Sequence, residues 1–172
     1  DDRTSLEAAQ EAKLRRLADK LDIRPGMRVL EIGCGWGSFA LLLAREYGVS
    51  VKGLTLSKRQ HELARERVAE AGLEGRVDIA LEDFRDTTGR FDRIVSVEMF
   101  EHTRNWKELL RRTSTWLEPG GRLFIHIFTH RTLAYRFAGT WASERFFTAG
   151  TMPSHDLILN FADDMVVKER WA

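Results

Sequence analysis

A short apolar run that breaks into alternating glycines constrains this chain more than any other stretch. Residues 28–32 read Arg-Val-Leu-Glu-Ile, which is typical of a buried strand, and Gly33, Gly35 and Gly37 follow at every second position. Ser38 is placed to cap a helix directly after this turn. Glycines at a strand-to-helix turn let the backbone approach a ligand closely, because no Cβ stands in the way. The stretch therefore predicts a strand, a ligand-binding turn and a helix.

The rest of the chain alternates segments typical of strands and of helices. Strands are expected at residues 28–32, 50–56, 76–81, 91–97 and 122–128. Helices are expected at residues 4–21, 38–47, 57–71 and 104–117, the first with Thr4 and Glu7 at capping-box spacing. Strands that alternate with such helices form right-handed βαβ units. The predicted fold class is α/β: a Rossmann-like, doubly wound, mostly parallel sheet with helices on both faces, in a single domain over residues 1–172.

Composition limits the classes of protein to which the chain can belong. Its 27 basic and 26 acidic residues give a net charge of +1, so no strong field favours nucleic acid or anionic lipid. Its one cysteine, Cys34, forms no internal disulfide and fits a reducing compartment. No apolar run approaches the roughly 18 residues that a membrane-spanning helix needs. We therefore expect a cytoplasmic protein with no nucleic-acid partner, no stable membrane insertion and no metal.

Polar residues cluster at most of the expected strand ends, where open α/β sheets bind their ligands. The glycine turn has Ser38 at the third glycine position of G-x-G-x-x-G, which weakens a dinucleotide interpretation. S-adenosylmethionine carries no phosphates and fits better. Glu31 would lie near its ammonium and carboxylate end, and Asp83 would accept from its adenine amino group. A tight turn without a ligand is the alternative, and Cys34 is more readily a packing residue than a nucleophile.

Five segments of the chain resemble class I S-adenosylmethionine-dependent methyltransferases. They read V-L-E-I-G-C-G-W-G at 29–37, G-L-T-L-S-K-R-Q at 53–60, L-E-D-F-R-D at 81–86, F-D-R-I-V-S-V-E-M-F-E-H at 91–102 and L-E-P-G-G-R-L-F-I-H at 117–126. Within that class, they are similar to the branch that contains the cyclopropane-fatty-acid synthases and the plant coclaurine N-methyltransferases. The resemblance covers nearly the whole chain.

The resemblance implies roles for most residues of the cofactor site. The glycines would line the methionine part, a Thr-Ser-Gln group would contact the ribose region, and an Asp-Phe pair would flank the adenine. A glutamine in the opening helix would close over the cofactor. Most class I enzymes carry an acidic residue where this chain has Thr55, a departure from the class but not from the branch. The residues expected to bind the cofactor are Gln10, Glu31, Gly33, Cys34, Gly35, Gly37, Thr55, Ser57, Gln60, Asp83 and Phe84.

Two carboxylates and an imidazole follow the fourth expected strand, at Glu98, Glu101 and His102. Methyl transfer from a sulfonium is an in-line displacement, in which the enzyme aligns the acceptor and, where needed, removes a proton. A protonated amine is a poor nucleophile, so a Glu that holds the ammonium and a His that accepts its proton are useful equipment. The alternative is that these residues form a cap or a surface pair before the next helix.

The resemblance adds His126 and leaves two acceptor chemistries open. Coclaurine-type enzymes carry E-M-F-E-H and are thought to use its two acids and its His on an amine. Cyclopropane synthases typically have a non-acidic residue in place of Glu98. They hold a bicarbonate with a Glu that matches Glu101 and a His that matches His126. His126 could instead be a core histidine. The expected catalytic residues are Glu98, Glu101, His102 and His126.

Glu98 and the segment 145–154 favour N-methylation of a small amine, aromatic or alkaloid-like in type, with Glu/His-assisted deprotonation. Trp141, Phe146 and Phe147 could form an apolar wall or cation–π contacts for this amine, or could be ordinary packing. Cyclopropane-fatty-acyl-phospholipid synthase-like modification of a lipid acyl chain is one alternative. Cofactor binding without catalysis is another.

The resembled enzymes continue beyond both ends of this chain. Residues 164–171 are expected to form a sixth strand, after which the sheet would be truncated. In the class I fold the last strand inserts between the fifth and the sixth, so the edge of strand five would be open. Open sheet edges pair with other chains. We therefore expect a homodimer through this edge, a swap of segments, or a need for the missing part.

Overall fold

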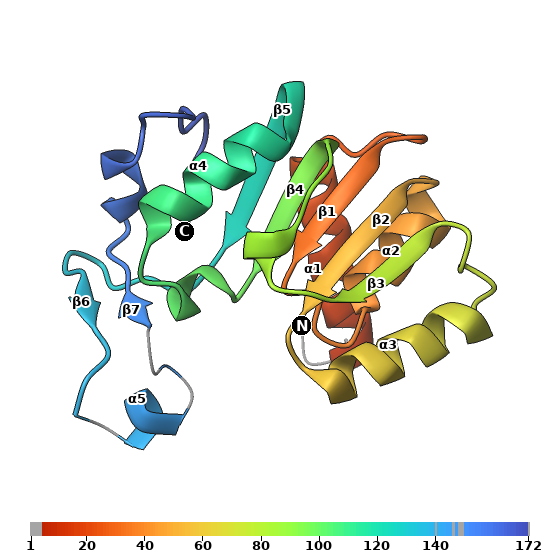
Figure 1. The fold of residues 1–172 in the computed structure, drawn as a ribbon, viewed down its shortest axis with the longest axis horizontal. Coiled ribbons are helices and arrows are strands. Elements are labelled where there is room, and N and C mark those ends of the chain that lie inside the picture. The colour runs from red at the N-terminus through yellow and green to blue at the C-terminus, as the bar shows by residue number, and fades with distance from the viewer. Residues whose placement is uncertain (1–4, 140, 146, 148–149, 172) are drawn as a thin grey trace. The chain divides into compact units, whose positions relative to one another are not determined.

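In the computed structural model, residues 5–139, 141–145, 147 and 150–171 are described (Figure 1). The helices in these residues are α1 (Leu6–Lys20), α2 (Ser38–Tyr47), α3 (Lys58–Glu70), α4 (Trp106–Trp116) and α5 (Trp141–Arg145). The strands are β1 (Arg28–Ile32), β2 (Ser50–Thr55), β3 (Val77–Leu81), β4 (Phe91–Val97), β5 (Leu117–His126), β6 (Tyr135–Arg136) and β7 (Thr151–Met152). The 3₁₀ turns are η1 (Phe84–Asp86), η2 (Phe100–His102) and η3 (Leu157–Asn160).

A five-stranded sheet with the order β3-β2-β1-β4-β5 organises the chain. β1 pairs in parallel with both β2 and β4, and β2 pairs in parallel with β3. Because β1 has a neighbour on each side, every residue after Arg28 in this strand is buried. The chain reverses direction along the sheet between β3 and β4, which is the arrangement of doubly wound folds. The predicted α/β, Rossmann-like fold class is confirmed.

The described residues form two compact units. The first contains the chain up to Val95 together with Leu117–Phe124. Its core includes Leu30 in β1, Leu43 in α2 and Ile94 in β4, none of which has measurable exposure. The second unit contains Ser96–Trp116 and the chain from Ile125 onward. The glycine turn therefore lies in the first unit, and the expected catalytic residues lie in the second.

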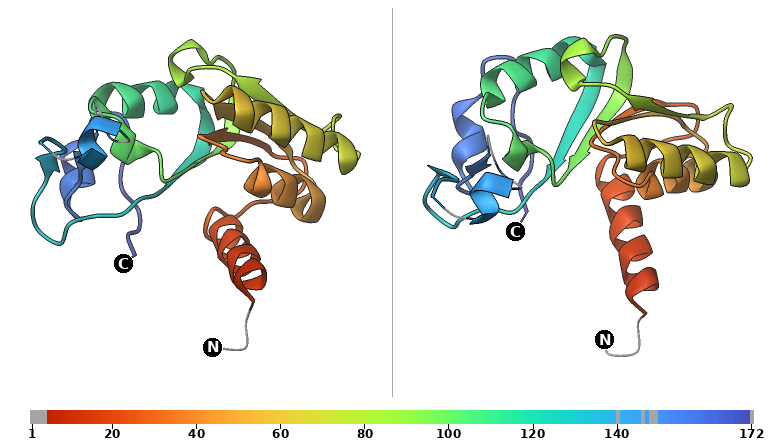
Figure 2. Two further views of the ribbon diagram at one scale, coloured as in Figure 1. Left: turned by 90° about the horizontal axis from the view of Figure 1, so that it is seen from below. Right: turned by 60° about the horizontal axis from the view of Figure 1, so that its bottom comes forward.

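Two helix starts differ from the prediction. Gly37, with φ 79°, is the N-cap of α2, and Ser38 is already inside the helix, because the left-handed backbone of the turn extends through Gly37. Thr4 lies outside the described residues. Ser5 caps α1 instead, and its Oγ accepts a hydrogen bond from the N–H of Ala8 at 3.1 Å. The first half of α1 extends away from the strands in both views of Figure 2, and Leu6 there is 77% exposed.

Two segments near the end of the sheet also differ. β5 begins at Leu117, directly after α4, whereas a turn was expected before residue 122. Gly121 lets the backbone pass closely here, because a Cβ there would lie 2.8 Å from the carbonyl oxygen of Glu118 and 3.1 Å from that of Asp92. The sixth strand expected at 164–171 is wrong, because these residues have no strand partner and almost all are exposed. β5 is the edge of the five-stranded sheet, and the homodimer expected through it stays a prediction.

Candidate active site

The glycine turn after β1 has a left-handed backbone, which glycine adopts readily. Gly33, Gly35 and Gly37 have φ values of 84°, 53° and 79°. A Cβ at Gly37 would lie 3.0 Å from Cβ of Ala64, so this glycine lets α2 and α3 pack closely. A Cβ at Gly35 would meet nothing within 4 Å. Gly35 therefore borders open space that a ligand can enter, whereas Gly37 serves packing.

Cys34 is a packing residue within this turn. Its side chain is 5% exposed, and burial raises the pKa of its thiol to about 12. A Cβ at Gly53 of the neighbouring β2 would lie 2.9 Å from Cβ of Cys34, so glycine is needed to admit this side chain. The N–H of Cys34 donates to the carbonyl of Leu54 at 2.8 Å. The thiol is buried and protonated. Any contact of Cys34 with a ligand would therefore be made by its backbone.

Glu31 is buried in β1 beneath the start of α2. It is 3% exposed, and its Oε2 has no hydrogen-bond partner. Burial raises the pKa of this carboxyl to about 8, while a hydrogen bond from the backbone N–H of Ala40 in the first turn of α2 acts in the opposite direction. A carboxylate near a helix N-terminus is stabilised by the helix dipole. The unpaired oxygen leaves Glu31 able to accept a hydrogen bond from a bound ligand such as an ammonium.

Thr55, Ser57 and Gln60, which the resemblance assigns to the ribose region, form one hydrogen-bonded group at the end of β2. Oγ1 of Thr55 donates to Oε1 of Gln60 at 2.7 Å and accepts from the N–H of Ser57 at 3.1 Å. Oγ of Ser57 caps α3 by accepting from the N–H of Gln60 at 3.3 Å. The side-chain amide of Gln60 is oriented by Thr55, and its Nε2 donates to none of the described residues. This N–H₂ group is available to a ligand.

Asp83 follows β3 and is held by a partner that sequence reasoning missed. It accepts from the backbone N–H of Arg85 at 2.8 Å, which caps η1. Both of its carboxylate oxygens also accept from the guanidinium of Arg85, at 3.0 and 2.8 Å. The Asp-x-Arg spacing is the sequence signal for this pair. Phe84 next to it is half-buried. Gln10 lies on the exposed part of α1, and its side chain forms no hydrogen bond with a described residue.

Exposed apolar side chains mark the carboxyl ends of the first three strands, and sequence reasoning missed them too. Trp36 in the glycine turn is 47% exposed, Leu56 after β2 is 72% exposed, and Leu81 at the end of β3 is 44% exposed. Large apolar residues that remain in water are informative when they gather at a ligand-binding edge. Their sequence signal is an apolar residue at the last position of a strand or just beyond it.

The second unit brings together Glu98, Glu101 and His126. Glu98 has φ 53°, which is unusual for a residue with a long side chain, and its N–H donates to the carbonyl of His126 at 2.8 Å. Oε1 of Glu98 lies 2.9 Å from Nδ1 of His126, without hydrogen-bond geometry. Glu101 is 1% exposed, and neither of its carboxylate oxygens has a hydrogen-bond partner. Burial raises the pKa of Glu101 to about 7, and the neighbouring Glu98 acts in the same direction.

An aromatic cluster packs around η2, which carries Glu101. His102 is exposed, and its ring stacks on Phe147 with a centroid distance of 4.9 Å and an interplanar angle of 12°. Phe147 also contacts Phe137 and Phe128, with centroid distances of 4.6 and 5.9 Å. Sequence reasoning included Phe147 in an apolar wall but missed the other two rings. Trp141 is 68% exposed on α5, and Phe146 lies outside the described residues.

Gly150 packs against the backbone of η2, and sequence reasoning missed this contact too. A Cβ at this position would lie 2.6 Å from the carbonyl oxygen of Glu101 and 2.9 Å from the ring of Phe137. The glycine thus allows the segment before β7 to pack directly on the backbone of Glu101. In the described part of the chain, no three His, Cys, Asp or Glu side chains are grouped so that they could hold a metal ion. Within the same residues, no helix combines the length and the apolar character required to cross a membrane.

Comparisons with known proteins agree on one family. The family model described as mycolic acid cyclopropane synthetase matches residues 1–168. A cyclopropane-fatty-acyl-phospholipid synthase of Escherichia coli is 40% identical over 99% of this chain and 44% of its own length. An (S)-coclaurine N-methyltransferase of Thalictrum flavum subsp. glaucum is 36% identical over 99% of this chain and 50% of its own. The chain thus spans about half the length of the curated relatives it matches.

A solved structure has the same fold. The crystal structure of a coclaurine N-methyltransferase bound to N-methylheliamine and SAH superposes with a TM-score of 0.85 at 31% sequence identity. It covers 95% of this chain and 51% of the solved one. The motifs predicted a resemblance to the branch that contains both kinds of relative, and this prediction is confirmed. The chain belongs to the mycolic acid cyclopropane synthetase family, whose relatives include cyclopropane synthases and S-adenosylmethionine-dependent methyltransferases.

Proposed function

We propose that the first unit binds S-adenosylmethionine at the glycine turn. Three observations support this: open space at Gly35, the unpaired buried Oε2 of Glu31, and the side-chain N–H₂ group of Gln60, which has no partner among the described residues. Glu31 would accept from the ammonium of the methionine part, and Gln60 would donate to the ribose. The exposed apolar residues at the ends of β2 and β3 suit a flat adenine ring. When bound, the cofactor would supply an electrophilic methyl group on its sulfonium.

We further propose that the second unit prepares a small amine for methylation. The observation that carries this is Glu101, a buried carboxyl without a hydrogen-bond partner beside a second carboxyl, Glu98. A buried carboxylate of this kind is costly unless a cation pairs with it. A protonated amine supplies that cation, and the rings of Phe147 and His102 offer a π surface beside it.

Proton removal from this amine falls to Glu101 and His102. A carboxyl whose pKa is about 7 is matched to a general base that works near neutral pH. Glu101 would hold the ammonium and accept one proton from it. His102 would relay that proton toward solvent, since its ring is exposed. The amine nitrogen then has a free lone pair for in-line attack, and the transferred methyl group replaces the lost proton on nitrogen.

A screen of amine acceptors with isotope-labelled methyl donor tests this proposal. We expect label transfer to at least one small amine, with a rate that rises with pH through about 7 as Glu101 ionises. Calorimetric titration with S-adenosylmethionine on the same protein separates donor binding from transfer. Donor binding without transfer to any amine would instead favour a cofactor-binding unit without catalysis.

A second candidate function is modification of a lipid acyl chain. The relative that acts on fatty acyl phospholipids is 40% identical to this chain, compared with 36% for the amine-methylating relative. His126 also lies beside Glu98, in the same group as Glu101. Incubation with unsaturated phospholipid vesicles, with and without bicarbonate, tests this candidate. Bicarbonate-dependent product on the acyl chain would support it, and a bicarbonate-independent amine product would exclude it.

A further inference from the structure

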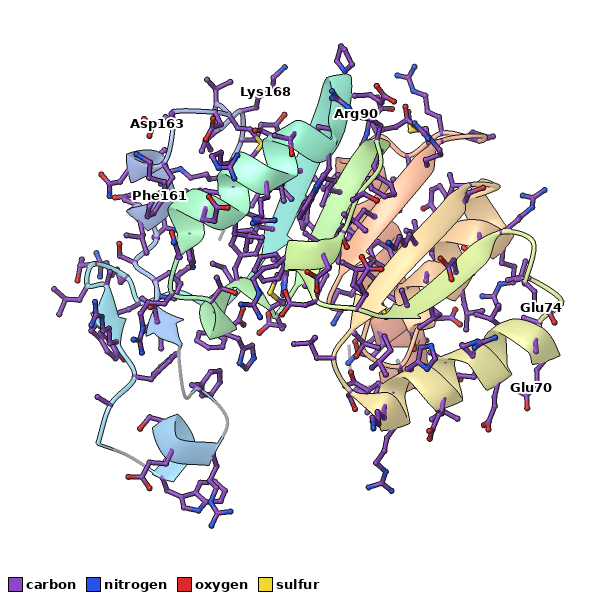
Figure 3. The ribbon with its side chains drawn as sticks, viewed as in Figure 1. Glu70, Glu74, Arg90, Phe161, Asp163 and Lys168 are labelled. Carbon is purple, nitrogen blue, oxygen red and sulfur yellow. The ribbon has the colours of Figure 1, made fainter. Side chains whose placement is uncertain are left out.

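The second unit contains a pocket of about 230 Å³ that includes none of the expected catalytic residues. The polar and aromatic side chains that line it are Arg104, Trp106, Tyr135, Arg136, Thr151 and Phe161. Phe161, labelled in Figure 3, follows η3 directly. The pocket is smaller than the roughly 300–1,000 Å³ of sites for drug-sized ligands. It has room for one small polar group with a ring or a short chain attached.

Local structure holds the walls of this pocket in place. Arg136 in β6 pairs directly across from Thr151 in β7, so both side chains start from a fixed antiparallel ladder. Trp106 is the first residue of α4, and its indole N–H donates to the carbonyl of Phe100 at 3.0 Å. The Trp106 and Phe161 rings lie 5.9 Å apart, centroid to centroid. Two neighbouring aromatic rings therefore line the pocket together with two arginines.

The charges around the pocket leave these two arginines unbalanced. Asp156 near η3 is paired with Arg170, and Asp163, also labelled in Figure 3, is paired with Lys107 at 2.9 Å. Neither the side chain of Arg104 nor that of Arg136 forms an ion pair or a hydrogen bond with any residue that the structure describes. Tyr135 and Thr151 add hydroxyl groups to the lining. The polar part of the pocket is thus rich in hydrogen-bond donors and carries positive charge.

We propose that this pocket binds a small molecule with a carboxylate or phosphate group on an apolar body. The guanidinium groups of Arg104 and Arg136 would hold the oxyanion, since arginine matches carboxylate and phosphate geometry with paired N–H donors. Trp106 and Phe161 would contact the apolar body. This site is independent of the methyl acceptor, which we assign to the group around Glu101.

Titration of the chain with hexyl phosphate tests the proposal, because this probe joins one phosphate to a short apolar chain. We expect saturable binding of one equivalent in calorimetry, at least tenfold tighter than that of inorganic phosphate. Arg104→Gln and Arg136→Gln should each weaken it at least tenfold. Arg131→Gln removes an exposed arginine of the same unit that does not line the pocket, and should change it less than twofold. Glu101→Gln should also leave it unchanged, which separates this result from the proposed function.

Three outcomes would overturn the proposal. Equal losses in Arg104→Gln and Arg131→Gln would mean that general positive charge, and not this pocket, attracts the probe. Binding to phosphatidic acid vesicles without any binding of free hexyl phosphate would mean a contact with a lipid surface instead. If a variant does not fold, the unmodified chain still decides the matter. The Trp106 indole N–H resonance must shift with hexyl phosphate, and an unchanged resonance at saturation would place the ligand elsewhere.

Discussion

At the end of β1, the backbone of a glycine turn forms most of the candidate binding surface, whereas at the end of β4 side chains form it. The first has three glycines in left-handed conformation above a strand that is almost fully buried. The second has a glutamate in that conformation, and no residue of β5 beside it is fully buried. Shape in the first region is built into the packed sheet. The chemistry of the second region depends on a few titratable side chains, and these can be substituted without a change of fold.

The largest expected effect tests the second region. Glu101→Gln keeps the volume of the side chain but removes its charge and its ability to accept a proton. We expect amine methylation to fall by about 10²–10⁴-fold, the usual contribution of a positioned general base. S-adenosylmethionine affinity should stay nearly constant, because the donor site lies in the first unit. Initial rates with labelled donor and calorimetric titration measure the two quantities. Glu144→Gln, at an exposed position of α5, is the matched control. A loss of donor affinity in Glu101→Gln as large as its loss of methylation rate would remove Glu101 from catalysis.

The next effect tests the burial of the Glu31 carboxyl in the first region, through the pH dependence of stability. The pKa of Glu31 is raised from 4.5 to about 8, so the folded state keeps this proton when the unfolded state has lost it. The contribution of Glu31 to stability therefore decreases as pH rises from about 4.5 to about 8, by an amount on the order of 5 kcal/mol. Glu31→Gln should remove that decrease. Urea unfolding at a series of pH values measures it, and parallel curves for the two proteins would contradict the buried, protonated carboxyl.

A pair of glycine substitutions separates packing from ligand approach. In Gly53→Ala, the new Cβ would lie 2.9 Å from Cβ of Cys34, and such overpacking costs about 1–3 kcal/mol of unfolding free energy. Gly35→Ala meets no neighbour, so its cost is limited to the roughly 1–2 kcal/mol of a left-handed alanine. Only Gly35→Ala should weaken S-adenosylmethionine binding, by tenfold or more. Denaturant melts and calorimetry report the two effects, and equal donor affinity in the two variants would show that Gly35 does not face the ligand.

Local sequence patterns predicted the first region well because its determinants are local. The bounds of β1 and β4, the glycine turn and the Ser57 cap of α3 all follow from short-range spacing. The second region depends on residues that are distant in sequence. Gly150 packs on the backbone of Glu101, and Phe137 meets Phe147 across the loop between β6 and β7. No periodicity encodes such contacts. The prediction of a sixth strand was wrong for a related reason, since a strand forms only where a neighbouring strand can pair with it.

The smallest expected effect concerns the one glutamate whose backbone conformation suits glycine. Glu98 has φ 53°, and a left-handed conformation costs a residue with a side chain roughly 1 kcal/mol. Glu98→Gly should therefore leave the unfolding free energy unchanged or raise it by up to about 1 kcal/mol, while amine methylation falls at least tenfold. Glu98→Gln loses the charge but keeps the strain, so it should lose activity without any gain in stability. Thermal melts and initial rates for both variants decide this. A loss of stability in Glu98→Gly would instead show that the Glu98 side chain stabilises the fold by more than its left-handed backbone costs.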